Sequence, residues 1–174
     1  GWNGEDYLST VFMYDPALDT WQERTSMPTA RAFSGAAAAG GKIYVIGGTA
    51  GESPLDINEI YTPARDSDLQ AAPWDYGFPL PDARQGFQVA TIADTIYVLG
   101  GTSSLINNYS LIYIPQNDTW QSLEASPQPL GAAFGLASIG PQLYIVGGEL
   151  DSAPSAQNLA YKALITLSIP IIIK

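Results

Sequence analysis

The chain alternates short apolar runs with clusters of glycine, proline and polar residues, and these clusters recur about every 8 to 12 residues. No stretch keeps its apolar residues at helical spacing for three turns. Short runs rich in Val, Ile and Tyr between turn-forming residues are typical of β-strands. The pattern therefore predicts an all-β fold.

Three of the apolar runs are copies of one another, and each copy ends in two glycines. The copies lie at residues 43–48, 96–101 and 143–148, so that successive copies are 53 and 47 residues apart. Their glycine pairs are Gly47 and Gly48, Gly100 and Gly101, and Gly147 and Gly148. A period of about 50 residues indicates a repeat architecture in which each repeat is one supersecondary unit.

Aromatic residues recur at fixed distances from the glycine pairs. A Trp precedes the second glycine by 27, 27 and 28 residues, and a Tyr follows it by 13, 12 and 13 residues. Gly1 precedes Tyr14 by 13 residues, as the second glycine of a pair would. Aromatic side chains with a polar tip suit the space between adjacent sheets. We therefore assign a structural role to the whole set: Tyr14, Tyr61, Tyr113, Tyr161, Trp21, Trp74 and Trp120.

Each repeat divides into four expected strands. The first is small and apolar (33–39, 87–92 and 132–139), the second carries the glycine pair, the third ends at the Tyr and the fourth carries the Trp. Glycines at the end of the second strand permit positive φ and a close approach of neighbouring backbone.

The glycine pair, the Tyr after it and the Trp seven residues later in two repeats together resemble kelch repeats. The resemblance implies four-stranded antiparallel blades of a β-propeller, which needs roughly 4 to 8 blades. It covers residues 1–161, as repeats 1–48, 48–101 and 101–148 and a partial repeat, or about three blades. We expect an open arc or part of a larger ring, whose missing blades come from a longer chain or a second copy.

Three places depart from the family pattern. Arg31 and Arg84 lie ten residues after a Trp, where the family has a charged residue, but the third repeat has Leu130 there. The second repeat has a longer connection before its Trp, and its polar residues 65–68 are expected to form a protruding loop. Residues 162–174 form a divergent tail, which we expect to be a strand that completes a blade rather than a terminus that docks elsewhere.

One end of the blades is the candidate binding face. In an antiparallel blade, the start of the first strand and the end of the second share an end, so the two arginines and the loops 49–56, 102–107 and 149–155 should meet there. The resemblance implies that ligands bind at this face. The candidate binding residues are Arg31, Arg84, Glu52, Asp56, Asn107, Glu149 and Asp151. An arginine fork suits a carboxylate or phosphate, whereas the alternative is that each arginine pairs with a carboxylate of a neighbouring blade or with backbone carbonyls.

Composition removes several classes of function. With 17 acidic and 7 basic residues the net charge is −10, which disfavours a nucleic-acid partner. The absence of His and Cys excludes disulfides, thiol nucleophiles and imidazole bases. We expect no metal and no cofactor. No run approaches the ~18 apolar residues of a membrane span, and an extracellular or cell-surface location is preferred to a cytoplasmic one.

The sequence thus predicts a non-catalytic interaction module that presents loops of one face to a protein or glycan. The alternative is a carbohydrate-acting enzyme similar to the kelch-type sialic-acid mutarotase, with Arg and carboxylates at the channel mouth. A copper radical oxidase of the galactose oxidase-like propeller type requires His and Cys ligands, which this chain lacks. A third hypothesis is a purely structural role within a longer protein.

Overall fold

The structure, a computed structural model, describes residues 1–67, 72–103, 110–123, 126, 128–150 and 153–163. The regular elements of these residues are β-strands and one short 3₁₀ turn, η1 (Pro63–Arg65). None of the described segments is a helix of the length and apolarity that crossing a membrane requires. The predicted all-β class is confirmed.

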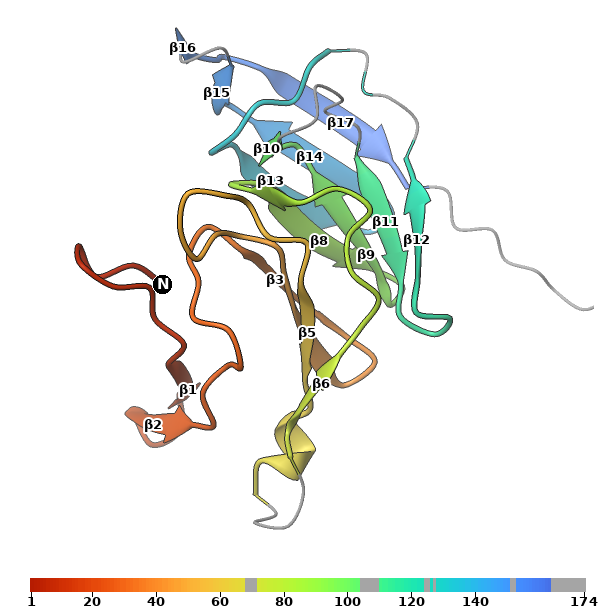
Figure 1. Cartoon of the computed structure of the whole chain (residues 1–174). Helices are drawn as coiled ribbons and strands as arrows, with labels where there is room; N and C mark the ends of the chain where they lie inside the picture. Colours follow the sequence, from red (N-terminus) through yellow and green to blue (C-terminus); the bar gives the residue numbers. More distant parts are fainter. Residues whose placement is uncertain (68–71, 104–109, 124–125, 127, 151–152, 164–174) are drawn as a thin grey trace, which may run out of the picture.

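Strands that follow one another in the chain pair in antiparallel sheets, which Figure 1 shows side by side. One four-stranded sheet has the order β3 (Gly35–Ala39), β4 (Lys42–Ile46), β5 (Asn58–Tyr61) and β6 (Trp74–Tyr76). The next has the order β8 (Gln88–Ile92), β9 (Thr95–Leu99), β11 (Leu111–Ile114) and β12 (Thr119–Ser122). These two sheets are the four-stranded blades that the repeats predict.

The remaining strands form smaller sheets of two or three strands. A three-stranded sheet contains β13 (Gly135–Ile139), β14 (Gln142–Val146) and β17 (Asn158–Lys162), and a hairpin contains β1 (Val11–Asp15) and β2 (Thr20–Arg24). The short strands are β7 (Arg84–Gln85) with β10 (Thr102–Ser103) and β15 (Glu149–Leu150) with β16 (Ala153–Pro154). Lys162 thus ends a strand, and the tail from residue 164 lies outside the described residues.

The first strand of each repeat begins later than predicted. The expected strand over 33–39 begins at Gly35, because Phe33 has a positive φ of 56° and interrupts the extended backbone. Gly86 and Ala133 have φ values of 68° and 55° at the same place in the next two repeats. A left-handed residue is therefore a fixed feature of the approach to the first strand.

The sheets pack face to face, and the main core lies between them. β3 lies beside β8, and β8 lies beside β13. The core cluster between the two four-stranded sheets consists of Ala37, Ala39, Tyr44, Ile46, Ile60, Leu80, Phe87, Ile96, Val98, Leu111 and Tyr113. A second cluster, which includes Leu99, Phe134, Leu143 and Ile145, joins the later sheets.

The glycine pairs have the backbone geometry that the sequence predicts. All six glycines have positive φ, for example 55° at Gly47 and 93° at Gly48. A Cβ atom at Gly48 would lie 2.5 Å from the carbonyl oxygen of Ala32. These positions therefore require glycine both for its φ and for the space.

The arginine position of the third repeat is occupied by Gly131, and the assignment of Leu130 was wrong. Ala32 bridges Thr49, and Ala132 bridges Glu149 in the same way, so the residue before Ala132 corresponds to Arg31. The segment between Trp120 and this position is one residue longer than in the other repeats. Counting from the Trp therefore pointed to the preceding residue.

In three places a Tyr of one strand lies directly opposite a Trp of the strand that pairs with it. Their ring centroids are 4.8 to 5.0 Å apart and tilted by about 40°. This is a favourable arrangement for two aromatic rings. The pairs are Tyr14 with Trp21, Tyr61 with Trp74, and Tyr113 with Trp120.

The second and third pairs are each joined to the preceding repeat by hydrogen bonds that we call the aromatic clamp. The indole N–H of Trp74 donates to the carbonyl of Thr25 at 3.0 Å, and that of Trp120 donates to the carbonyl of Phe78 at 2.8 Å. Thr25 and Phe78 each lie four residues after the Trp of their own repeat. The clamp therefore links successive repeats in one fixed register.

An aspartate completes the clamp five residues after the Tyr. Asp66 accepts a hydrogen bond from the Tyr61 hydroxyl at 2.6 Å, and Asp118 accepts one from Tyr113 at 2.6 Å. Asp118 also accepts from the backbone N–H of Phe78 at 2.7 Å, across the interface between the sheets. This aspartate recurs five residues after the Tyr in the sequence, a constant spacing that was not among the predicted landmarks.

The polar insert at 65–68, which was expected to protrude as a loop, also contacts the preceding repeat through Asp66. The 3₁₀ turn η1 extends beyond the ends of β5 and β6, as a protruding loop would (Figure 1). Asp66, however, accepts hydrogen bonds from the backbone N–H and the hydroxyl of Thr25 in the preceding repeat. The start of the insert is therefore part of an interface, and residue 68 lies outside the described residues.

The clamp predicts a loss of stability in alkali. Burial and the hydrogen bond to Asp66 raise the pKa of Tyr61 from 10.0 to about 12. Because the folded chain holds this proton more tightly than the unfolded chain, the contribution is complete below pH 10 and is lost between pH 10 and 12. We expect the free energy of urea unfolding to fall over this range by on the order of 2 kcal/mol from this group. Tyr61→Phe should lose less than the parent over the same range, and an equal loss would contradict the prediction.

Candidate binding face

The starts of the first strands and the loops after the glycine pairs lie at one end of the sheets, which we call the glycine-pair face. Ala32 bridges Thr49, which begins the loop after the first pair, and Ala132 bridges Glu149 after the third. Arg84 lies on β7 and pairs with Ser103 of β10. The predicted meeting of these segments at one end is therefore confirmed for the described residues.

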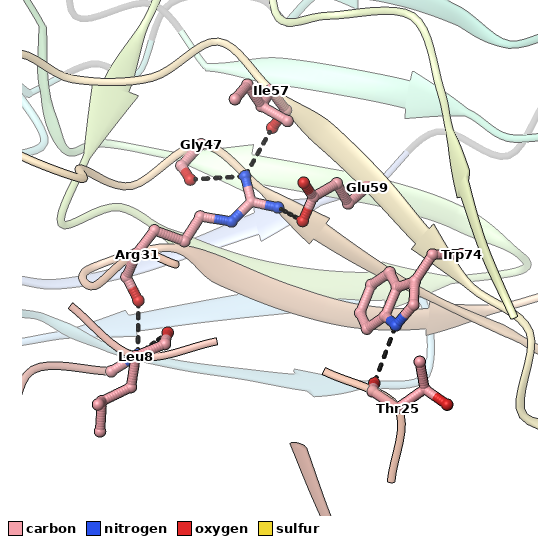
Figure 2. A network of polar contacts seen from close by, with 8 residues as sticks. Leu8, Thr25, Arg31, Gly47, Ile57, Glu59 and Trp74 are labelled. Atoms are coloured by element: carbon pink, nitrogen blue, oxygen red, sulfur yellow. Dashed lines mark hydrogen bonds and ion pairs between the residues drawn. The ribbon is translucent and has the colours of Figure 1, made fainter. Parts of the chain in front are cut away.

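Arg31 is fully buried at this end, with 0% of its surface exposed. Its guanidinium donates to the carbonyls of Gly47 and Ile57 at 3.3 and 3.4 Å and forms an ion pair with Glu59. Figure 2 shows the guanidinium between these three groups. Glu59 is also 0% exposed, so both members of the pair are shielded from water.

Arg84 has the corresponding place in the next repeat and is 1% exposed. Its guanidinium donates to the carbonyl of Gly100, the glycine that corresponds to Gly47, at 3.4 Å. It also forms an ion pair with Asp82 at 3.2 Å. Both arginines therefore tie the start of a first strand to the glycine pair that ends the second.

These contacts match the predicted pairing role, with one correction. Each arginine binds a carboxylate and at least one carbonyl of its own blade, whereas the expected carboxylate was that of a neighbouring blade. No pattern in the sequence points to Glu59, which is 28 residues from Arg31 and becomes its neighbour only when β4 and β5 pair. Ligand contact by the arginines stays a prediction.

The predicted carboxylates of the loops are exposed. Glu52 lies in the turn between Thr49 and Pro54, Asp56 follows that turn, and Glu149 begins β15. Asn107 and Asp151 lie outside the described residues. Among the residues that the structure describes, no group of three or more acidic side chains could hold a metal ion.

Exposed aromatic residues form the part of this face that the sequence analysis missed. Trp2 and Tyr7 bridge each other with ring centroids 4.8 Å apart, and the Tyr7 hydroxyl donates to the carbonyl of Gly51 at 3.3 Å. Phe33, which directly follows the bridged Ala32, is 62% exposed. The signal in the sequence was a phenylalanine where the next repeat has glycine.

One cavity among the described residues lies away from this face. It has a volume of about 250 Å³ and opens between the β1–β2 hairpin and the sheet of β4 and β5. Its lining is mostly apolar: Val11, Phe12, Met13, Arg24, Ile43, Tyr61, Pro63 and Ser67. None of the predicted binding residues lines it.

Comparison with known proteins adds independent findings. Residues 1–28 and 30–67 match the sequence model of the Kelch motif. Kelch-like protein 35 of Mus musculus is 28% identical over 161 residues, which are 91% of this chain and 26% of that protein. An F-box/kelch-repeat protein of Arabidopsis thaliana is 29% identical over 87% of this chain and 35% of its own length. Kelch-like protein 23 of Homo sapiens is 30% identical over 82% of this chain and 25% of its own length. The chain spans about a quarter to a third of these relatives.

Proposed function

Because the chain belongs to the kelch-repeat family, we propose that it is a non-catalytic scaffold that binds a protein partner through its glycine-pair face. The observation that carries the proposal is the composition of this face. Its arginines are buried in ion pairs, while Phe33, Trp2 and the carboxylate of Glu52 are exposed. Exposed aromatic groups beside polar groups are typical of protein-binding surfaces.

The buried ion pairs also bear on the enzyme alternative. A carbohydrate-acting site needs two accessible carboxylates beside a group that orients the sugar. The carboxylates that contact Arg31 and Arg84 are Glu59 and Asp82, and both are buried. None of the three relatives named above bears the name of an enzyme. No observation of this chain favours the enzyme.

Panning a random peptide library against the immobilised chain tests the proposed function. We expect the recovered peptides to lose binding when Glu52 and Asp56 are both replaced by Trp, because bulky side chains would obstruct the face. The matched control also introduces Trp, at Asp94 in the turn between β8 and β9 and at Gln142, the first residue of β14. Both positions lie at the opposite end, and this control should leave binding unchanged. Failure to recover peptides, or equal loss with the control, would overturn the proposal. A glycan array run with the same variants would detect a glycan partner instead.

A further inference from the structure

Phe33 combines two features that do not stabilise the fold. Its φ of 56° lies in the left-handed region, which is unfavourable for a bulky side chain, and 62% of its surface is exposed. The same position is Gly86 in the next repeat and Ala133 in the third, so the architecture does not require a ring there. An unfavourable conformation that also exposes an aromatic ring points to a function of the ring itself.

The backbone places a second aromatic group on the same edge of the face. Residues 1–8 form a small hairpin that attaches beside Phe33, since the amide of Arg31 donates to the carbonyl of Leu8 at 3.2 Å. Trp2 lies on this hairpin with 48% of its surface exposed. Its partner Tyr7 donates to Gly51 in the loop after the first glycine pair. Hydrogen bonds thus bring the hairpin, the loop and the strand start that carries Phe33 to one edge of the face, and we call these residues the patch.

The charge of the patch is acidic. Glu5 and Asp6 lie in the hairpin, Glu52 lies in the loop and Asp56 follows it, and all four are exposed. Among the described residues, Arg31 and Arg84 are the basic side chains at this end, and both are buried in ion pairs. The amino group of Gly1 donates to the carbonyls of Leu8 and Arg31. The patch therefore offers aromatic faces and carboxylates to a ligand without an exposed basic side chain.

We propose that this patch binds a basic segment of the protein partner, in which arginine or lysine side chains pack on Phe33 and Trp2 and pair with the surrounding carboxylates. A guanidinium or ammonium group is attracted to the face of an aromatic ring within about 6 Å. The aliphatic stems of the same side chains cover apolar surface while their charged ends reach the carboxylates. This inference rests on the proposed function and names the chemical class of its partner.

A titration with synthetic peptides tests the inference. The probes are a short fluorescein-labelled peptide of arginine and leucine separated by glycine and serine, and the same peptide with glutamate in place of every arginine. Fluorescence anisotropy with the full 174-residue chain should show at least tenfold tighter binding of the basic peptide. High salt should weaken that binding, because charge pairing supplies part of it. Equal binding of the two peptides would overturn the inference.

Variants of Phe33 separate a binding role from a structural one. Phe33→Ala and Phe33→Gly should each lower affinity for the basic peptide at least fivefold. Phe33→Gly should also have a higher thermal midpoint than Phe33→Ala, because glycine accepts the positive φ without strain. Phe12→Ala removes a phenylalanine of similar exposure from β1, outside the patch, and should leave the affinity unchanged. Retained affinity in Phe33→Gly, or an equal loss in Phe12→Ala, would contradict the inference.

The two proposals fail in different ways. If library peptides bind the glycine-pair face but are acidic or neutral, the scaffold function stands and the basic partner is excluded. If no peptide binds this face, the scaffold function itself fails. If basic peptides are recovered and bind independently of Phe33 and Trp2, the assignment of the aromatic patch is wrong.

Discussion

Replacing Arg31 by methionine is expected to lower the free energy of unfolding by about 3–5 kcal/mol, the usual cost of leaving one charge of a buried pair without its partner. Glu59 would remain with 0% of its surface exposed and without the guanidinium. Burial already lowers the pKa of Arg31, and the charge of Glu59 opposes that shift. Urea unfolding followed by tryptophan fluorescence measures the loss.

Two further variants identify the cause of that loss. Arg31→Met combined with Glu59→Met should recover most of the stability, since an apolar pair of similar volume carries no buried charge. Arg65→Met removes the pair between Arg65 and Asp75, whose side chains are 43% and 46% exposed. That control should cost no more than about 1 kcal/mol, because water screens an exposed pair. If Arg31→Met costs no more than Arg65→Met, the buried pair does not have the role assigned to it.

Gly131→Ala is expected to destabilise the chain by about 3 kcal/mol, at the upper end of the usual cost of overpacking. A Cβ atom at Gly131 would lie 1.7 Å from the carbonyl oxygen of Glu149. That atom belongs to the backbone bridge between Ala132 and Glu149, so it moves only if the bridge opens. The expected loss of stability comes from this clash and not from backbone strain, because Gly131 does not have a positive φ.

Gly135→Ala is the matched control in the same repeat. A Cβ atom there would have its nearest neighbour, the carbonyl oxygen of Val146, at 3.6 Å, which is an ordinary contact. Its effect on the free energy of unfolding should stay within about 0.5 kcal/mol. Equal urea midpoints for the two variants would show that the backbone around Gly131 adjusts freely.

The strands were predictable because their signal is local. Each repeat has its glycine pair, Tyr and Trp at nearly constant spacing. The Tyr and Trp residues lie on the expected strands, and each glycine pair directly follows the second strand of its repeat. The start of the first strand was misplaced because the positive φ of Phe33 has no signature in residue type. The third arginine position was assigned to Leu130 because the count began at the Trp, although the backbone bridge that defines the position involves the glycine-pair loop.

The site was predictable only in outline. Antiparallel pairing placed the arginines and the loops at one end, but it did not reveal which groups the arginines would contact. The approach of Glu59 to Arg31 depends on the register between β4 and β5, which pairs Ile46 with Asn58. The clamp aspartates were within reach of sequence analysis, since Asp19, Asp66 and Asp118 share one spacing from a Tyr. Phe33 was counted as the first residue of the expected strand over 33–39, and its exposure was therefore not predicted.

The aromatic clamp also marks where this architecture tolerates a change of length. Asp19 and Asp118 precede their Trp by two residues, whereas Asp66 precedes Trp74 by eight. Both Asp66 and Trp74 nevertheless bind Thr25, so the six additional residues leave the interface in place. The segment between the aspartate and the Trp is thus a natural insertion point. A reporter or affinity tag inserted between Asp118 and Trp120 should extend the hairpin outward, away from the glycine-pair face, and leave that face available to its partner.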